Sequence, residues 1–313
     1  MTPALASANN GNWQTARRWS QMLRSHYQVG LVDQWQGEPA EVLVALHARR
    51  SAASIQRWAR DRPGNPLAVV LTGTDLYRDI HVDAEARRSL DLADRLVVLH
   101  DRAIDDLPAP YRAKAIVCFQ STTVRQPLDK TAQHLRCVMV GHLREEKAPQ
   151  TYFEAARRLA NRHDILLDHI GDALDPTLGT EAQALQQSCP HYRWLGGLPH
   201  EATRARIQSA HVLVHTSRME GGAHVVMEAI CSGTPVLATR ISGNVGMLGI
   251  DYAGYFEPGD AEGLARLIER CRDQPAILQE LGVQCAARAP LFKPEREWAS
   301  LLALVNDLLE NRR

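Results

Sequence analysis

The chain alternates short apolar runs with amphipathic segments along most of its 313 residues. Val212-Leu213-Val214, for example, is a β-branched apolar run of the kind that forms buried parallel strands. A helical segment follows from about Ala223, Gly233 ends it, and a new strand begins at Val236. Repeated strand–helix units of this kind predict an α/β fold with doubly wound parallel sheets.

The alternation occurs twice, on either side of a polar stretch at 120–134 that includes Pro127 and lacks periodicity. We interpret that stretch as an interdomain linker, and we expect one Rossmann-like domain over 1–134 and a second over 135–292. In the first series the predicted strands cover 2–6, 28–32, 42–46, 67–71, 95–99 and 115–119, and the predicted helices cover 13–26, 51–62 and 83–93. The strand at 2–6 is short and contains Pro3, which suggests an upstream start codon or a poorly formed sheet edge.

The second series ends in an amphipathic helix at 295–309. Its expected apolar face carries Trp298, Leu301, Leu302, Val305 and Leu308. Before it, the predicted strands cover 137–140, 165–170, 192–195, 212–216 and 236–238, and the predicted helices cover 150–161, 180–188, 200–209, 223–232 and 260–271.

Composition narrows the class of protein. Lys and Arg together number 36, as do Asp and Glu, so the formal net charge is +0 and argues against a nucleic-acid partner. None of the six cysteines is in a Cys-x-x-Cys pair, which favours reduced core residues and no zinc site. No apolar stretch is long enough to span a membrane, and Met1–Ala8 does not look like a signal peptide. We therefore expect a soluble cytoplasmic enzyme.

One stretch brings two carboxylates to a glycine-rich loop that begins a helix. Glu220 and Glu228 flank this loop, and Gly221, Gly222 and Ala223 lie where backbone amides meet the helix N-terminus. Glycines allow a ligand to approach the backbone closely, and a helix N-terminus attracts anions. The spacing alone fits a solvated glutamate and a helix-start glycine pair equally well.

A second strand-end loop, which begins at Gly141, carries cations. Arg144 provides a guanidinium fork and Lys147 a point charge, a combination suited to a diphosphate. A solvated helix face would have the same spacing. Gly171 and Leu198 follow two further strands of the same predicted sheet and are candidate neighbours of a bound nucleotide, or ordinary turn residues.

Two polar loops follow strands in the first domain. Gly11 and Asn12 lie between its first strand and first helix, and Thr74, Asp75 and Arg78 follow a central strand. Ligands bind at such strand ends in α/β sheets, although plain turns look similar. No Asp-x-Asp pair follows a suitable strand, so we expect no metal ion and no other cofactor.

The second half resembles the GT-B retaining glycosyltransferases of the family 4 type. Glu220–Glu228 matches their Glu-x7-Glu motif, and Gly141, Leu143, Glu146 and Lys147 match their Gly-x-Leu-x-x-Glu-Lys pattern, with His142 where the family usually has Arg. The resemblance implies two Rossmann-like domains facing a cleft and a final helix, 293–313, that crosses back to the first domain. It also implies that Arg144 and Lys147 neutralise a donor diphosphate, that Glu228 holds the ribose, and that Glu220 and the neighbouring amides hold the sugar.

Two N-terminal stretches carry a closer resemblance. Asn10–Trp19 and Leu71–Ile80 are similar to the selenosugar synthase of selenoneine biosynthesis. That family implies transfer of a sugar from a UDP-sugar to selenophosphate, and a possible hand-off to the next pathway enzyme. In this reading Gly11, Asn12, Thr74, Asp75 and Arg78 form the acceptor site, with Arg17 or Arg18 as a further cation.

Other functions share much of this pattern. A family 4 glycosyltransferase with a hydroxyl acceptor has the same donor motifs, and a UDP-sugar epimerase has the same fold but needs acids and bases on both faces of the sugar. A non-catalytic sugar-nucleotide sensor would bind UDP tightly without turnover. UDP-GlcNAc and UDP-glucose are equally compatible donors.

Overall fold

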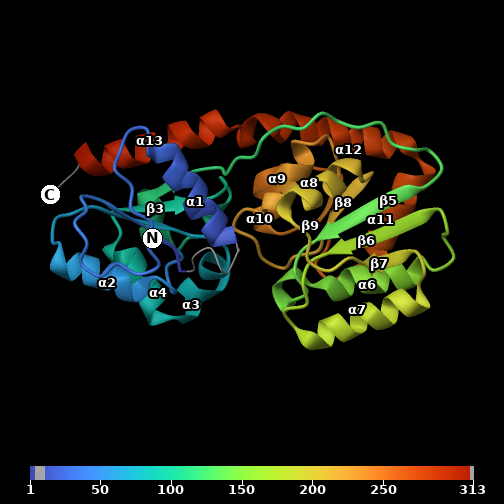
Figure 1. Cartoon of the computed structure of the whole chain (residues 1–313), viewed down its shortest axis with the longest axis horizontal. Helices are drawn as coiled ribbons and strands as arrows, with labels where there is room; N and C mark the ends of the chain where they lie inside the picture. The colour runs from blue at the N-terminus through green and yellow to red at the C-terminus, as the bar shows by residue number, and fades with distance from the viewer. Residues whose placement is uncertain (4–10, 311–313) are drawn as a thin grey trace. The chain divides into compact units, whose positions relative to one another are not determined.

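The computed structural model describes Met1–Pro3 and Gly11–Glu310 (Figure 1). The chain forms two compact units. Unit 1 comprises Met1–Ser121, Glu220–Gly222 and Leu291–Arg313, and unit 2 comprises Thr122–Met219 and Ala223–Pro290. Each unit is built on its own parallel sheet.

Unit 1 has a four-stranded sheet in the order β1-β2-β3-β4. Its strands are β1 (Leu43–Leu46), β2 (Leu67–Val70), β3 (Arg95–Val98) and β4 (Ala115–Val117). Its helices are α1 (Gly11–Leu23), α2 (Ala52–Asp61), α3 (Ile80–Val82), α4 (Ala84–Leu92), α5 (Ala103–Asp106) and α13 (Pro294–Glu310).

Helices cover both faces of this sheet (Figure 1). On one face, Ile55 and Trp58 of α2 and Leu90 of α4 pack with Val69 of β2. On the other face, Trp19 of α1 and three leucines of α13 pack with Val70. Adjacent strand residues therefore belong to different cores, as expected for a strand buried on both faces.

Unit 2 has a six-stranded sheet in the order β10-β9-β8-β5-β6-β7. In chain order within the unit this is the 3-2-1-4-5-6 arrangement of a Rossmann sheet, and it reverses between β5 and β8. The strands are β5 (Leu135–Val140), β6 (Ile165–Ile170), β7 (Tyr192–Trp194), β8 (Val212–His215), β9 (Val236–Thr239) and β10 (Tyr255–Phe256).

In Figure 1 α6 and α7 lie on one side of the unit 2 sheet, and α8 and α9 lie on the other. The helices of the unit are α6 (Pro149–Arg158), α7 (Pro176–Ser188), α8 (His200–Ser209), α9 (His224–Ile230), α10 (Ser242–Leu248), α11 (Ala261–Asp273) and α12 (Pro275–Arg288). Of these, α10 and α12 have no counterpart among the sequence predictions. Residues 120–134 contain no helix or strand, and the structure describes all of them.

Several sequence predictions differ from the structure. Residues 28–32, all of them described, form no strand; Val32 only accepts one backbone hydrogen bond, from Thr2. Most of the strand expected at 2–6 lies outside the described residues, although Met1 exchanges backbone hydrogen bonds with Val44 and Leu46. The polar loop after β2 is a five-residue π-helix, η2 (Asp75–Asp79), that continues into α3.

The apolar face predicted for α13 was wrong at one position. Trp298 is 37% exposed, whereas Glu297 is fully buried beside Leu301. The Glu297 carboxylate accepts hydrogen bonds from the Arg18 guanidinium, the Trp19 indole, and the backbone N–H and hydroxyl of Ser121. A buried charge with this many donors is satisfied where it lies.

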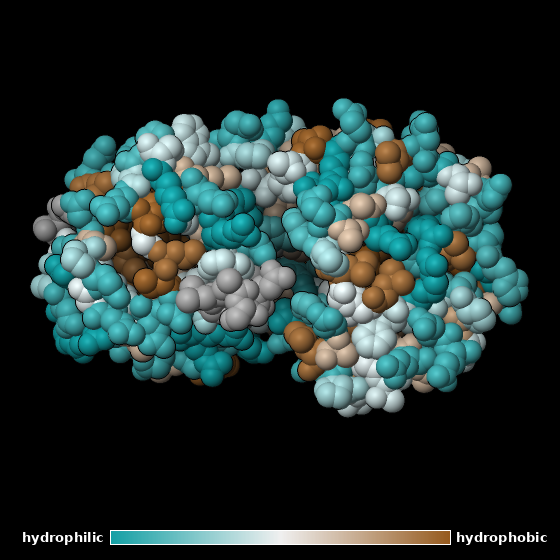
Figure 2. Space-filling model, viewed as in Figure 1, coloured by the Kyte–Doolittle hydropathy of each residue, from teal (hydrophilic) through white to brown (hydrophobic). Residues whose placement is uncertain are grey.

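The surface and the core otherwise match the composition. Figure 2 shows a mainly hydrophilic face with small apolar patches. All six cysteines are buried and free, as expected from their spacing. In the described part of the chain, each helix is too short or too polar to cross a bilayer.

Candidate functional site

The reversal of strand order in unit 2 brings the loops after β5 and β8 together. The Thr216 hydroxyl, just past β8, donates to the Lys147 carbonyl at 2.7 Å. The Arg218 N–H donates to the Glu146 carbonyl at 2.9 Å. Because crevices at such a reversal are where α/β sheets bind nucleotides, these joined loops form the core of the candidate site.

The two predicted cations of the β5 loop lie at this point. Arg144 is 43% exposed in its side chain, and its Nε is 3.9 Å from Glu146 Oε2. Among the described residues that Nε is buried and has no hydrogen-bond partner. The aliphatic stem of Lys147 crosses Gly141, since a β-carbon there would meet Lys147 Cγ and Cδ at 3.5 Å. A buried, unsatisfied guanidinium nitrogen beside a lysine suits an anionic ligand.

Glycines allow the neighbouring strand ends to approach closely. Gly171 has φ +151, and a β-carbon on it would lie 2.0 Å from the Gly141 carbonyl oxygen. The Gly171 N–H donates to the Gly196 carbonyl at 2.8 Å, so backbone hydrogen bonding between neighbouring strands continues past the ends of β6 and β7. His142, which replaces the expected arginine, accepts a hydrogen bond from the Asp172 N–H at Nδ1. Partial burial lowers the pKa of His142, so this ring contributes little positive charge.

Glu228 of α9 is only 4% exposed and points to the start of α8. Its Oε1 is 2.6 Å from His200 Nε2 and 4.0 Å from Arg204 Nε. The hydrogen bond to Glu228 raises the pKa of His200 above its usual value. Leu198 lies two residues before His200 and is half-buried. Glu228 therefore contacts His200 and lies near Arg204, and Leu198 is two residues along the chain from this contact.

The glycine loop of the Glu-x7-Glu motif divides between the units. Glu220–Gly222 groups with unit 1, and α9 begins one residue after Ala223 in unit 2. A β-carbon on Gly221 would lie 2.5 Å from the Thr72 carbonyl carbon, so this loop packs directly on the end of β2. The Ala223 N–H donates to Met247 Sδ at 3.2 Å. The role expected for this amide in holding a sugar stays a prediction.

The N-terminal candidates lie at the carboxyl ends of the unit 1 strands. Gly11 is exposed and Asn12 half-buried at the start of α1. Gln120, after β4, donates to the Thr15 hydroxyl at 2.5 Å and lies beside Gly222. This hydrogen bond joins α1 to the segment after β4.

Two residues expected at the acceptor site have structural roles instead. Asp75 is fully buried, and its oxygens accept backbone N–H groups of Ala48, Thr72 and Gly73. It fixes the turn after β2 and has no exposed oxygen for a ligand. Arg18 is committed to Glu297, with Nε 2.8 Å from Oε2.

Thr74 and Arg78 keep accessible positions. Thr74 is half-buried and Arg78 is exposed, with its Nε 3.1 Å from Asp79 Oδ1. His47, which the sequence did not single out, lies 3.2 Å from the Thr74 hydroxyl through Nε2. No sequence signal marks His47, His200, Arg204 or Gln120, because each acquires its partner from a distant segment.

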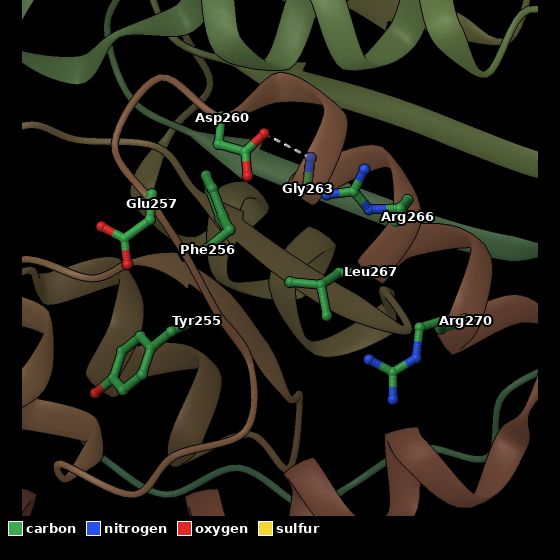
Figure 3. Close-up of a pocket in the computed structure, with 8 residues that line it drawn as sticks. All are labelled: Tyr255, Phe256, Glu257, Asp260, Gly263, Arg266, Leu267 and Arg270. Atoms are coloured by element: carbon green, nitrogen blue, oxygen red, sulfur yellow. Dashed lines mark hydrogen bonds between the residues drawn. The ribbon is translucent and has the colours of Figure 1, made fainter.

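A separate shallow hollow of about 340 Å³ lies at the edge of unit 2 (Figure 3). Tyr255, Phe256, Asp260, Arg266 and Arg270 line it. Asp260 caps α11 through the Gly263 N–H. None of the predicted site residues lines this hollow.

Comparison with known proteins identifies the family. A family model described as glycosyl transferases group 1 matches residues 120–292, more than half of the chain. The chain is also 28% identical over 129 residues to a GDP-mannose-dependent alpha-mannosyltransferase of Corynebacterium glutamicum, a match that covers 41% of this chain and 29% of that protein.

Solved structures share the fold at low identity. A TarM variant of S. aureus, in complex with Fondaparinux, alpha-GlcNAc-glycerol and UDP, has a TM-score of 0.69 at 12% identity, covering 85% of this chain and 55% of that one. HepE of Anabaena in complex with UDP-glucose has a TM-score of 0.69 at 15% identity, covering 85% and 79%. These likenesses confirm the GT-B α/β fold. Because the family model covers more than half of its residues, the chain belongs to the glycosyl transferases group 1 family.

Proposed function

We propose that this protein moves a sugar from UDP-GlcNAc or UDP-glucose to selenophosphate, forming a selenosugar for selenoneine biosynthesis. One observation carries the donor half of the proposal. The buried Arg144 Nε lacks a hydrogen-bond partner among the described residues, at the point where the order of the unit 2 strands reverses. A donor diphosphate would satisfy that nitrogen, and structural neighbours crystallised with UDP or UDP-glucose support this choice of donor.

Each donor residue then has a role. Arg144 and Lys147 neutralise the diphosphate as it leaves, and Gly141 and Gly171 border the nucleotide. Glu228 accepts hydrogen bonds from the ribose hydroxyls, and Leu198 borders the base. Glu220, with the amides of Gly221 and Gly222, holds the sugar.

The transfer is a substitution at the anomeric carbon. A lone pair on the selenium of selenophosphate forms the C1–Se bond while the C1–O bond to UDP breaks, and the electron pair of that bond leaves on the β-phosphate oxygen. Selenium is already an anionic nucleophile, so no carboxylate needs to act as a base. Water then cleaves the P–Se bond to release phosphate and the selenosugar.

The selenium half of the proposal rests on the resemblance of Asn10–Trp19 and Leu71–Ile80 to selenosugar synthases. Gly11, Asn12, Thr74 and Arg78 are the proposed acceptor contacts, and Asp75 supports Thr74 and Arg78 by fixing the turn after β2. Residues 1–134 and the final helix 293–313 then act as the acceptor domain, and 135–292 as the donor domain.

Six buried, reduced cysteines fit a cytoplasmic enzyme, the compartment in which we place the reaction. The selenosugar would pass to the next enzyme of its pathway. Cations and backbone amides serve the leaving group without a metal ion, so turnover should persist in EDTA.

Mass spectrometry of the reaction product tests the proposal. Purified protein incubated with UDP-GlcNAc or UDP-glucose and selenophosphate should yield a sugar with the selenium isotope pattern. The donor half is tested with Arg144→Ala. Its matched control is Arg266→Ala, because Arg266 is an exposed, ion-paired arginine of the same unit. Absence of a selenium-bearing sugar from the wild-type reaction would refute the selenium half.

A further inference from the structure

His47 follows β1 in an unusual backbone conformation. Its φ is +72, a left-handed value shared in the described chain by only one other non-glycine residue. Such a conformation is strained in a non-glycine residue and persists where the surroundings impose it. Here the His47 N–H donates to Val70 at 2.8 Å, and its carbonyl accepts from Ser51 at 3.1 Å. The turn thereby directs the imidazole towards the loop after β2.

The hydrogen bonds of the ring define its tautomer. The Arg50 N–H donates to His47 Nδ1 at 3.3 Å, so Nδ1 carries a lone pair. The hydrogen of the neutral ring is therefore on Nε2, which lies 3.2 Å from the Thr74 hydroxyl oxygen. Burial lowers the pKa of His47 and keeps the ring neutral, against the opposing charges of Asp75 and Asp79.

The Thr74 hydroxyl consequently accepts a hydrogen bond from His47. Its own hydrogen must then point elsewhere, and the hydroxyl does not cap η2. Within the described ranges His47 is the only hydrogen-bond partner of this hydroxyl. Arg78 follows four residues later in η2 and is exposed, with its Nε 3.1 Å from Asp79 Oδ1. The Thr74 hydroxyl thus presents a hydrogen-bond donor in a segment that also carries an exposed positive charge.

We propose that His47 is a positioning residue that fixes Thr74 as a hydrogen-bond donor to an anionic acceptor of the phosphate class. The inference rests on the proposed acceptor site and deepens it, because it specifies an oxyanion over a neutral sugar hydroxyl. An oxyanion only accepts hydrogen bonds, so it matches a site whose groups donate. His47 acts through Thr74 and touches no substrate.

The test uses inorganic phosphate as the probe and the full-length protein saturated with UDP, which occupies the donor site. The 15N-labelled backbone N–H groups of the loop after β2, which every variant retains, report phosphate binding by NMR titration. His47→Asn removes the imidazole while retaining a residue that tolerates left-handed φ. We expect the phosphate Kd to rise about tenfold in His47→Asn and in Thr74→Val, with Thr74→Ser close to wild type.

The double variant His47→Asn/Thr74→Val should bind phosphate no more weakly than Thr74→Val alone, because both changes remove one interaction. The inference would be overturned if the two substitutions together raised the phosphate Kd by the product of their separate effects. An unchanged Kd in His47→Asn would also overturn it. Should His47→Asn misfold, the imidazole 15N shifts of the wild type decide: a hydrogen on Nδ1 in place of Nε2 refutes the argument. Phosphate binding does not depend on selenium chemistry, so failure of the inference can be distinguished from failure of the proposed function.

Discussion

His200 Nε2 lies 2.6 Å from Glu228 Oε1, so the carboxylate proposed to hold the ribose already has a partner. Glu228 is almost fully buried, whereas the His200 side chain is 67% exposed. Solvent can therefore protonate His200 while Glu228 stays in place. The pair makes the availability of Glu228 dependent on pH.

UDP binding should strengthen as pH rises through the pKa of His200. The hydrogen bond to Glu228 raises the pKa of His200 above its usual value of about 6.5. At pH values below the raised pKa, the protonated imidazole therefore binds the Glu228 carboxylate and competes with the ribose. Above the folded-state pKa the imidazole is neutral, so its interaction with Glu228 weakens and the ribose hydroxyls bind the carboxylate more readily. Calorimetry at pH 6 and pH 8 should show a larger change in UDP affinity for wild type than for His200→Gln. Identical pH dependence in the two proteins would exclude this coupling.

The same pair affects stability in the opposite direction. A raised folded-state pKa stabilises the fold below the unfolded pKa, and this contribution is lost as pH rises through the folded value. Since His200 is largely exposed, we expect the pair to contribute under about 1 kcal/mol to the free energy of unfolding. The change in thermal midpoint between pH 6 and pH 8 should be smaller in His200→Gln than in the wild type. An equal change in the two proteins would contradict a stabilising His200–Glu228 pair.

Glu228→Gln should weaken UDP binding by about ten- to a hundredfold, because a charged acceptor for the ribose hydroxyls is lost. Glu201→Gln is the matched control: Glu201 is on α8 with its side chain 74% exposed. Titration calorimetry with UDP measures both. Equal affinities in the two variants would remove Glu228 from the donor site.

Lys147→Ala and Arg144→Ala should each reduce turnover by at least tenfold while the thermal midpoint stays near that of wild type. Each variant removes a charge-assisted contact to a leaving diphosphate. Steady-state UDP release measures the effect, with Arg266→Ala as control. Near-wild-type turnover in Lys147→Ala would argue against a diphosphate at the β5 loop.

Glu297→Ala should destabilise unit 1 by about 3–5 kcal/mol, since it leaves the Arg18 guanidinium and Ser121 without their buried partner. Glu295→Ala, at an exposed position on the same helix, should have little effect. Urea unfolding monitored by tryptophan fluorescence distinguishes them. Equal midpoints for the two variants would show that the buried carboxylate is dispensable.

Sequence periodicity was enough to find the strands of both sheets except the two-residue β10, and most helices. Runs such as Val212–His215 are apolar throughout because both faces of the strand are covered. The order of the strands, which joins the β5 and β8 loops, depends on tertiary packing and has no local signal. The error in α13 has a similar origin: the donors that satisfy the buried Glu297, such as Ser121, lie far away in the chain and cannot be read from the local pattern.

The candidate site was predictable where a motif marks it and hidden where partners come from elsewhere. Gly141, Arg144 and Lys147 were found through their strand-end pattern, and the structure joins their loop to Thr216. Asp75 looked like a ligand-binding carboxylate because its backbone partners, including Ala48, cannot be read from the sequence. His47 and His200 were missed for the same reason.

The central claim is that selenophosphate is the acceptor, and acceptor-dependent UDP release tests it most directly. Initial rates would be measured with UDP-GlcNAc and with UDP-glucose, adding selenophosphate or a neutral hydroxyl acceptor such as glycerol, glucose or N-acetylglucosamine. We predict that UDP appears rapidly only with selenophosphate. Faster release with a hydroxyl acceptor would contradict the selenium assignment and leave a glycosyltransferase of ordinary acceptor chemistry.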